Sequence, residues 1–467
     1  MVNPECSFNR GFMSLNFLEL EERSYTGEVL DKESWDLDRI ASAVMEIVEK
    51  YKLSWDKTNL IPNDEDMFRR YYAAGRELLV SSGVYNMSTG RVIRFSEEEI
   101  DEAAANQRQS FVMGSGKDAF TLYARAPEDP RKPAVFGGNP GCPTPEKIFS
   151  ACVRSWAQEK AVDLLTCGSL VDVDGYQVRL GEASELLAVR RELKYLNQAS
   201  ADAGRAGMGR LAAESAVSQT GDLAAFAEGF IRSGDAHLVA LNNELITCQD
   251  NMVRAANALH TGVYNASLAC VMVEGLAGGA PGAAVVMIAS LLAANIICMA
   301  DYHLCHPIHL RHIATSTREC MWLQSVICQA FYHCAPNIIV CDIYPKSGAL
   351  TRELLYETAA NALAITVSGG HLEGVGSCDG LKPHGTGLEA RLMGEVGRFV
   401  SRTLMKRGEV NRIILELLKK YEHVFESGNP GVSFEFAYDV NTVKPKSEWL
   451  DMYKEVCGEL LSLGIKL

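Results

Sequence analysis

The stretch NIIVCDIYP, residues 337–345, decides the fold. It is a short apolar run that ends in polar side chains before Pro345, which is typical of a strand in a buried parallel sheet. Runs similar to NIIVC recur after residue 130, and they begin at Ala134 (AVFGG), Ala161 (AVDLLTCGSL), Ala236 (AHLVAL), Leu268 (LACVMVEGLAGG), His306 (HPIHLRHIAT) and Ala364 (AITVSGG). One more segment, AGMGRL from Ala206, is too glycine-rich to be assigned from its pattern.

Helical stretches separate these runs, as at residues 144–160, where Thr144-Pro145-Glu146 opens a helix. Strands that alternate with helices predict a parallel sheet. Seven or eight such units in about 270 residues favour an α/β fold of the (β/α)8 TIM-barrel type. A doubly wound open sheet is the alternative. However, no G-x-G-x-x-G follows the first strand and no G-x-x-x-x-G-K-[ST] occurs, so the phosphate loops of nucleotide-binding sheets are missing.

Residues 1–125 are predicted to form a helical N-terminal extension packed on the barrel. An apolar stripe runs through 37–51, a second helix is expected over 64–82, and Ser96 with Glu99 forms a capping box for a third. Residues 126–467 are predicted to form the barrel and its C-terminal helices, within one globular unit. Another capping box at Thr386 begins a helix, and helix 409–424 is expected to pack across one end of the barrel.

The composition excludes several classes of protein. Of the 467 residues, 47% are hydrophobic and 22% charged, which excludes a disordered chain. A net charge of −14 disfavours nucleic acid and anionic lipid as main partners, because both require a positive field. The 14 cysteines form no Cys-x-x-Cys pair, and the first residues show no signal peptide, so a reduced cytoplasmic protein is expected. The apolar run 280–300 is interpreted as a buried helix, with no membrane as partner.

The strongest candidate site residues are Asp342 and Tyr344. Their spacing of two places both side chains on one face of a strand. At the carboxyl end of a barrel strand, that face points to the active-site mouth. A carboxylate beside a phenol binds a cation or acts in acid and base catalysis, although a plain strand-end cap has the same pattern.

Other patterns are weaker. His303, His306, His309 and His312 recur at every third residue, but Pro307 prevents a helix and a strand would turn them to alternate faces. No metal site is therefore predicted, and the histidines are expected along a strand end and its loop, where one or two could contact substrate. Cys142 lies in a glycine-proline loop and is a minor nucleophile candidate. The glycine-rich turn AGRAGMGRL, residues 203–211, allows a close backbone approach.

Several stretches resemble one family over nearly the whole chain. They are WDLDRI at 35–40, the helix 64–82 with SGVY after it, AGRAGMG at 203–209, HPIHLRHIATSTRE at 306–319 and TGLEARLMGEV at 386–396. The chain resembles the monomethylamine:corrinoid methyltransferases of methanogenic archaea. This resemblance implies a barrel that assembles as a homo-oligomer and moves a methyl group from methylamine to the cobalt of a separate corrinoid protein. It implies no tightly bound cofactor, because the partner protein carries the corrinoid.

The chain departs from the family at the residue that defines it. Members of the family carry pyrrolysine shortly after the Gly-Met-Gly turn, and the resemblance places Leu211 there. It also places Leu268 where the family has a glutamate and Asp342 where it has a glutamine, while Tyr344 is kept. Ala212 and Ala213 replace the small Gly-Pro pair of the family. These concerted changes favour a relative that lacks pyrrolysine over an error in the sequence.

Without the imine of pyrrolysine, methyl transfer has to occur by direct displacement. A quaternary or other cationic amine carries an activated methyl group, so we expect such a donor and a corrinoid Co(I) acceptor. Asp342 and Tyr344 are the expected catalytic residues. Leu211 and Leu268 are expected to line the substrate site with them. The alternatives are an inactive barrel that serves as a binding or assembly subunit, and a different lyase or transferase assisted by a metal at His303 or His309.

Overall fold

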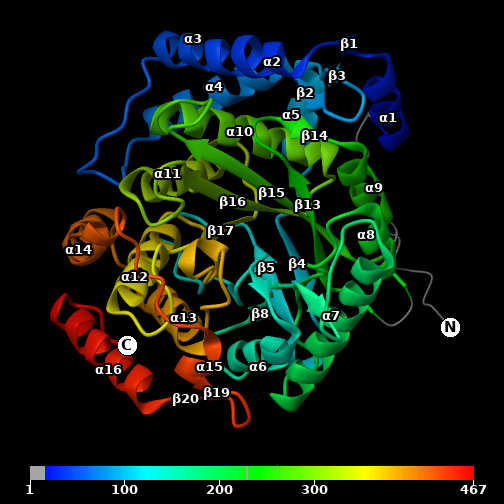
Figure 1. Ribbon diagram of the computed structural model, residues 1–467. Helices are drawn as coiled ribbons and strands as arrows, with labels where there is room; N and C mark the ends of the chain where they lie inside the picture. The colour runs from blue at the N-terminus through cyan, green and yellow to red at the C-terminus, as the bar shows by residue number, and fades with distance from the viewer. Residues whose placement is uncertain (1–15, 228–229, 260) are drawn as a thin grey trace.

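Eight parallel strands form the centre of the molecule (Figure 1). The computed structural model describes residues 16–227, 230–259 and 261–467. A bridge between Leu165 and Arg210 joins the first and last strands of the sheet, so the sheet closes into a barrel. In sheet order the strands are β12 (Leu211–Ala212), β13 (Ala236–Leu241), β15 (Tyr264–Val273), β16 (Tyr302–His309), β17 (Ile339–Ile343), β18 (His371–Gly374), β6 (Val135–Gly137) and β8 (Leu164–Leu165).

A helix follows each barrel strand in the chain and covers the outside of the barrel, which confirms the predicted (β/α)8 architecture. Thr386 caps the last of these helices through the capping box expected from the sequence. The helices are α6 (Glu146–Ala157), α7 (Ala183–Asp202), α8 (Gln219–Ala225), α9 (Gln249–Asn257), α10 (Ala280–Ile297), α11 (Arg318–Cys334), α12 (Arg352–Val367) and α13 (Gly387–Thr403).

Side chains alternate between two cores along the strands. Outward-facing residues such as Ala269, Val271 and Val273 of β15 join the large core between strands and helices. Inward-facing residues form a second, smaller core inside the barrel. Its members from the strands are Ala134, Phe136, Leu164, Leu211, Ala236, Tyr264, Ala266, Tyr302, Leu304, Ile338 and Val340, with Leu238 and Leu268 partly buried against them.

A β-hairpin closes the amino-terminal end of the barrel. It consists of β4 (Ser110–Met113) and β5 (Phe120–Tyr123). The ring of Phe111 packs on the ring of Tyr264, the first residue of β15, with centroids 4.2 Å apart and the ring planes tilted by 37°. The N–H of Gly114 donates to the carbonyl of Gly234, just before β13. The active-site end of a barrel is the opposite, carboxyl-terminal end, so this hairpin leaves it uncovered.

The N-terminal part of the chain forms a layer over one side of the barrel. Its helices are α1 (Phe17–Thr26), α2 (Lys32–Ser34), the π-helical segment Trp35–Ser42, α3 (Ala43–Lys50), α4 (Glu65–Ser82) and α5 (Glu97–Ala105). It also contains β1 (Glu28–Val29), β2 (Val84–Asn86) and β3 (Arg91–Ile93), which pair with β14 (Ile246–Thr247) from the loop after β13. The extension is therefore less purely helical than the sequence predicted, because Asn86–Arg91 is a tight turn between two short strands.

Helix α10 lies between this layer and the barrel, in contact with α3, α4, α5, α11, β15 and β16. Gly75 of α4 allows the closest approach, since a Cβ there would lie 2.5 Å from the Ile288 side chain. Among the described residues, α10 is the one helix long and apolar enough to cross a membrane, but 94% of it is buried. The prediction of a buried helix at 280–300 is thus confirmed.

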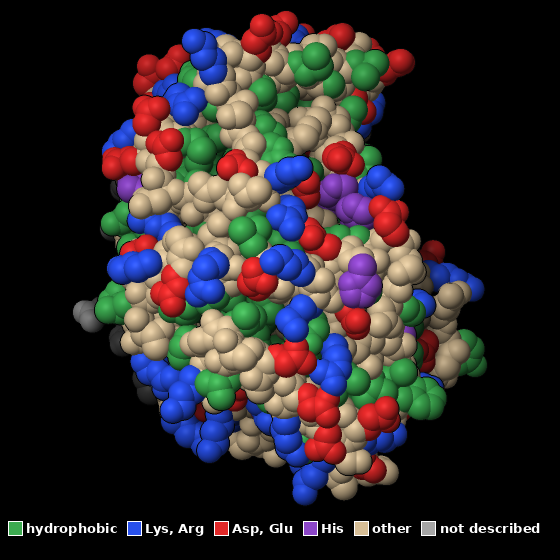
Figure 2. Space-filling model, turned by 90° about the vertical axis from the view of Figure 1, so that its left-hand side faces the viewer, with side chains coloured by type: hydrophobic (Ala, Val, Ile, Leu, Met, Phe, Trp, Pro, Cys, Tyr) green, Lys and Arg blue, Asp and Glu red, His purple; other side chains and the backbone are tan. Residues whose placement is uncertain are grey.

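The C-terminal helices α14 (Arg407–Tyr421) and α16 (Ser447–Ser462) pack on the outer side of α12, so the expectation that they cross one end of the barrel is wrong. Figure 2 views this side of the molecule, where acidic and basic side chains are intermingled. Short elements complete the chain: β7 (Pro143–Thr144), β9 (Ser169–Leu170), β10 (Asp172–Val173), β11 (Tyr176–Gln177), α15 (Phe434–Ala437), β19 (Tyr438–Asp439), β20 (Lys444–Pro445) and the single 3₁₀ turns Gly116–Asp118, Cys378–Gly380 and Glu422–Val424.

One strand assignment from the sequence is wrong. The run AITVSGG from Ala364 belongs to the end of α12, and the strand begins later, at His371. Leu354 to Val367 are all buried, so this helix has no polar face to reveal its period. Gly369, at φ +95°, turns the chain from the helix into β18. The runs from Leu268 and His306 are strands, but each begins four residues earlier than predicted.

Replacing Phe111 with alanine is expected to lower the free energy of unfolding by roughly 3 kcal/mol, because it leaves a void where the hairpin fills the barrel. Urea unfolding followed by circular dichroism measures this change. Val112 of the same strand is 48% exposed, so Val112→Ala is the matched control and should change stability by less than about 0.5 kcal/mol. Equal losses in both variants would contradict a plugging role for the hairpin.

Candidate active site

Inward-facing polar side chains lie in one row near the carboxyl ends of four neighbouring strands. Strand register places Cys270 beside His306 and Asp342 beside Glu373. A contact of 2.5 Å between His306 Nδ1 and Asp342 Oδ2 joins the two halves of the row. Below it, at the next inward level, are Leu268, Leu304 and Val340, which are also register partners. The row is therefore the first level of polar side chains toward the mouth, and Leu268, Leu304 and Val340 beneath it form an apolar floor.

Asp342 is 3% exposed and is the next-to-last residue of β17, so it is a buried carboxyl group within the strand and no simple cap beyond its end. Burial raises its pKa well above the usual range, while the neighbouring Glu373 side chain acts in the opposite direction. Burial also lowers the pKa of His306 to about 4, so this imidazole is neutral at physiological pH. The 2.5 Å contact is thus a hydrogen bond of a neutral histidine to a carboxyl group.

Tyr344 lies two residues beyond Asp342, one level closer to the mouth, as its spacing predicted. Its hydroxyl donates to the carbonyl of Pro140 at 2.5 Å. Its ring meets the His306 ring edge-on at 4.4 Å between centroids. A Cβ at Gly376 or Gly380 would collide with the ring, so these two glycines allow it to lie against the loop after β18. The hydroxyl proton is committed to Pro140, and the ring is what Tyr344 presents to the site.

Leu211 and Leu268 both belong to the inner core, from β12 and β15. Leu211 is 1% exposed and lies beside Ala236 in register, whereas Leu268 is partly exposed. Both leucines thus belong to the inner core, but at different levels: register places Leu211 level with Ala236 and Tyr264, whereas Leu268 is level with Ala240, nearer the mouth. Whether the two leucines contact a substrate together with Asp342 and Tyr344 stays a prediction.

Solvent reaches the upper interior of the barrel. Along β15, the inward-facing Leu268, Cys270 and Met272 keep accessible surface, while the outward-facing residues between them are buried. The same alternation occurs on β13 at Leu238 and Ala240. Inward side chains that are more exposed than outward ones require open space inside the barrel. This space begins above Ala266, which is fully buried.

Two further carboxyl groups face this region, and the sequence reasoning did not propose either. Glu373 of β18 is completely buried, and its pKa is raised well above normal by burial and by Asp342. Glu214, just after β12, also has a raised pKa, because of burial and of its proximity to Glu373. Glu214 Oε1 has no hydrogen-bond partner among the described residues. The unpaired hydroxyl of Tyr302 lies near the same three acids, which together with burial raise the pKa of this phenol.

The sequence contains signals that point to both of these acids. Glu373 sits in the segment HLEG, which would have been recognised as the strand if the preceding helix had not been mistaken for one. Counting two-residue steps from a correct strand start pairs Glu373 with Asp342 on the inward face. Glu214 follows the glycine-rich turn directly, and only the short β12 shows that this turn leads into the barrel.

The histidine run divides between the two faces of β16, as predicted. His303 points outward to Ser267 and to Phe331 of α11, and burial lowers its pKa to about 3. His306 points inward. His309 and His312 lie at the strand end and beyond it, with ring centroids 4.5 Å apart. In the part of the chain that the structure describes, no group of three His, Cys, Asp or Glu residues is arranged to hold a metal ion.

Cys142 does not have the environment of a reactive thiol. It is buried, its thiol donates to the carbonyl of Lys382 at 2.7 Å, and burial raises its pKa to about 12. Nucleophilic cysteines need the opposite shift, because the thiolate is the reactive form. The structure therefore gives no support to the minor candidate from the sequence.

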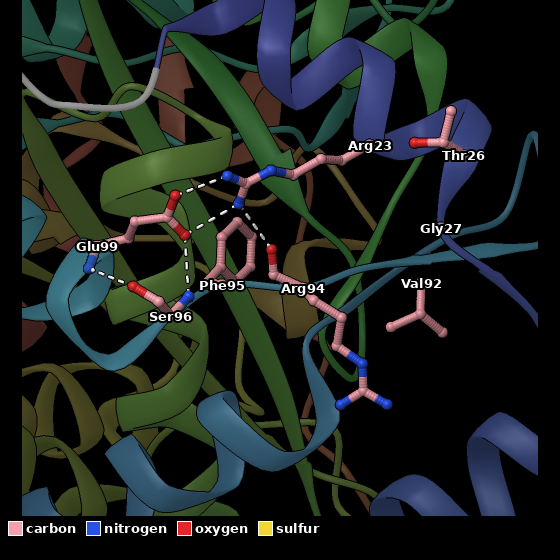
Figure 3. Close-up of a pocket in the computed structure, with 8 residues that line it drawn as sticks. All are labelled: Arg23, Thr26, Gly27, Val92, Arg94, Phe95, Ser96 and Glu99. Atoms are coloured by element: carbon pink, nitrogen blue, oxygen red, sulfur yellow. Dashed lines mark hydrogen bonds and ion pairs between the residues drawn. The ribbon is translucent and has the colours of Figure 1, made fainter.

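Among the surface pockets outside the barrel interior, two have histidine or arginine side chains paired with acids. One, of about 250 Å³, is lined by His309, His312, Glu274, Arg318 and Glu422 among others, beside the end of β16. The other, of about 490 Å³, is a shallow groove between α1, β3 and α5 (Figure 3). In the groove, Arg23 is held by both carboxyl oxygens of Glu99, at 2.6 and 2.9 Å. Its principal charged groups are thus already paired with each other.

Comparison with known proteins identifies the family. A sequence model of the family described as monomethylamine methyltransferase MtmB matches residues 15–465. The chain belongs to the MtmB family. It is 33% identical over 467 residues to monomethylamine methyltransferase MtmB2 of Methanosarcina acetivorans, covering 98% of this chain and 99% of the relative. Identity to MtmB of Methanosarcina mazei is 32% with the same coverage.

The fold comparison agrees. The crystal structure of Methanosarcina barkeri MtmB matches with a TM-score of 0.94 at 32% identity, over 97% of this chain and 98% of that one. A structure of a hydroxylamine MtmB complex matches with the same score. The family resemblance and the barrel predicted from the sequence are thereby confirmed. The absence of pyrrolysine stays a prediction.

Glu373→Gln is expected to stabilise the protein more at about pH 8 than at about pH 5. An acid whose pKa is higher in the folded than in the unfolded chain keeps its proton on folding. The free energy of unfolding therefore falls as pH rises above the unfolded pKa of about 4.3. Glutamine removes this loss, so the variant should gain roughly 1 kcal/mol or more at the higher pH. Thermal unfolding at both values measures the effect, and an equal shift at both would contradict the raised pKa.

Proposed function

We propose that this chain transfers a methyl group from a quaternary or other cationic methylated amine to the Co(I) of a corrinoid carried by a separate protein. Membership in the MtmB family supports methyl transfer from a methylated amine. The observation that carries the choice of a cation is the gathering of Asp342, Glu373 and Glu214 over the apolar floor of the barrel. Acids facing a solvent-accessible apolar space suit a ligand that is both positive and methylated.

The reaction is a displacement at the methyl carbon. The two electrons of Co(I) form the Co–C bond, and the electrons of the C–N bond leave with nitrogen. A quaternary donor departs as a neutral tertiary amine, so the step needs no proton and no further reactant. The positive charge on nitrogen is what activates the methyl group, and it disappears in the reaction.

The residues of the chain act before and during this step. Asp342 supplies the counter-charge that holds the ammonium group, and His306 orients that carboxylate through the contact at Oδ2. The ring of Tyr344 offers a π face next to the mouth. Leu211 and Leu268 exclude water from the methyl groups of the donor that face the inner core. A leucine has no imine, so the donor binds here by electrostatics and packing without a covalent adduct.

The solvent-accessible interior favours this catalytic function over an inactive barrel that serves as an assembly subunit. A barrel without a substrate would be expected to fill its upper interior with side chains, as the lower interior is filled by the hairpin. The inward-facing residues of β13 and β15 instead remain accessible.

A methyl-transfer screen tests the proposal. The protein, reduced Co(I) corrinoid and a panel of donors are combined, and methyl-cobalt formation is followed by absorbance. Tetramethylammonium and other quaternary amines are expected to react, and neutral methylated compounds of the same size are not. Asp342→Asn should weaken use of the cationic donor by about 1–3 kcal/mol in kcat/KM. Glu274→Gln, at a carboxylate 55% exposed outside the barrel, is the matched control and should leave it unchanged.

Transfer from monomethylamine alone would refute the choice of donor, and transfer from none of the donors would refute the activity. Equal rates for Asp342→Asn and the unaltered protein would remove Asp342 from the site. Because asparagine preserves the shape of the side chain, the unfolding temperature of this variant serves to separate a binding defect from misfolding.

Residue 211 is expected to be leucine in protein purified from its native source. The replacement of the neighbouring Gly-Pro by Ala212-Ala213 and of pocket residues at 268 and 342 motivates this prediction. Mass spectrometry of the peptide that contains residue 211 decides it. A peptide with the mass of pyrrolysine at this position would refute the electrostatic mechanism, since an imine would then be present.

A further inference from the structure

Asp342 and Glu373 form a buried carboxyl pair on adjacent strands. They are partners in the register of β17 and β18, at 3% and 0% exposure. Within the described residues, neither forms an ion pair with a lysine or arginine; the one charged-type contact, from His306 to Asp342 Oδ2, comes from a neutral ring. Asp342 Oδ1 and both carboxyl oxygens of Glu373 have no hydrogen-bond partner among the described residues. No cation among the described residues therefore balances a negative charge on this pair.

The two residues are register partners on adjacent parallel strands, so their carboxyl groups lie side by side inside the barrel. Ionised carboxylates only accept hydrogen bonds, so a hydrogen bond between the two would require a proton on one of them. Two adjacent carboxyl groups in a buried site cannot both ionise, because neither water nor a cation compensates the repulsion. His306 already contacts Asp342 Oδ2, and Oδ1 is left without a partner among the described residues, so it is the oxygen that could accept a hydrogen bond from a protonated Glu373. Glu373 is the deeper of the two, and its other neighbour is the hydroxyl of Thr166.

We infer that Glu373 stays protonated and donates its O–H to Asp342, so that Asp342 is the single carboxylate that meets the substrate cation. Glu373 is thus a positioning residue that acts through Asp342. The inference rests on the proposed function, in which Asp342 binds the ammonium group. In this role Glu373, whose carboxyl group is normally ionised, is an uncharged hydrogen-bond donor.

The surroundings favour a single charge at this place. A second negative charge beside Asp342 would add repulsion, and no cation among the described residues pairs with either carboxyl group. Arg254 lowers the pKa of Glu214, at the rim, and not that of the pair. A neutral donor below Asp342 avoids this repulsion and still fixes the orientation of its carboxylate. The titratable groups that face the pair come from several neighbouring elements: Glu214 after β12, Cys270 on β15, Tyr302 and His306 on β16, and Tyr344 after β17.

Binding of tetramethylammonium chloride, measured by isothermal titration calorimetry from about pH 5 to about pH 9, tests the inference. Glutamine is a neutral donor of the same shape as protonated glutamate. Glu373→Gln should therefore keep the affinity within about twofold and leave the midpoint of the pH profile in place. Glu373→Leu removes the donor, so it should weaken binding about tenfold at neutral pH and move the midpoint to higher pH. Glu274→Gln again serves as the control.

An infrared difference spectrum supplies a second readout that needs no ligand. The unaltered protein minus Glu373→Gln should contain the carbonyl stretching band of a protonated carboxyl group at neutral pH. Absence of this band would overturn the inference. So would a loss of affinity in Glu373→Gln as large as that in Asp342→Asn, because Glu373 would then act as a second charge. Circular dichroism checks the fold of Glu373→Leu, and the isosteric glutamine variant decides the question if the leucine variant fails to fold.

The two proposals fail in different ways. If the glutamine variant loses affinity while methyl transfer from cationic donors proceeds, the role of Glu373 is wrong and the proposed function stands. If the binding pattern is as expected but no donor is demethylated, the cation site stands and the transfer activity is wrong.

Discussion

Closure of eight parallel strands into a narrow barrel is the constraint on which the rest of the structure depends. In such a barrel every second side chain of a strand points inward, and register aligns it with the inward side chains of its neighbours. Cys270, His306, Asp342 and Glu373 are brought together in this way from segments up to about a hundred residues apart. Because the interior is too small to hydrate each group separately, the protonation of one is decided by the others. The chemistry of the site is therefore a property of the row and of no single residue.

The sequence alone predicted the architecture well, and the reasons are physical. Short, mostly apolar strands such as β13 and β17 differ clearly from surface segments, and capping residues such as Thr386 mark helix starts directly. Asp342 and Tyr344 could be singled out because two-residue spacing after a certain strand has one geometric meaning. Where a helix is buried on every side, as in α12, its period disappears, and the strand beside it was misplaced. That single error also hid Glu373, since the partner of Asp342 is found by register and register requires the correct start of β18.

Other features lie beyond what sequence patterns contain. The hydrogen bond from Tyr344 to Pro140 joins residues about two hundred positions apart, and the sequence around either residue does not indicate it. The strand β12 is two residues long and follows a turn rich in glycine, so its place in the barrel depends on pairing with β13 and not on its own composition. Leu211 therefore came to attention through family resemblance, and the structure adds that its side chain belongs to the inner core. The proposed function accordingly assigns substrate recognition to the carboxyl groups of the barrel interior.

The arrangement of α10 has a consequence for how the protein is made. Translation proceeds from the N-terminus, so α3, α4 and α5 leave the ribosome well before residues 280–297. The most apolar helix of the chain is thus synthesised after the segments that cover it, among them Gly75, which lies against Ile288 in the folded protein. In a permuted chain that began at the barrel, a segment of membrane-spanning hydropathy would emerge before the segments that cover it. The order of the chain therefore places the covering surface ahead of a helix whose own sequence is consistent with a membrane span.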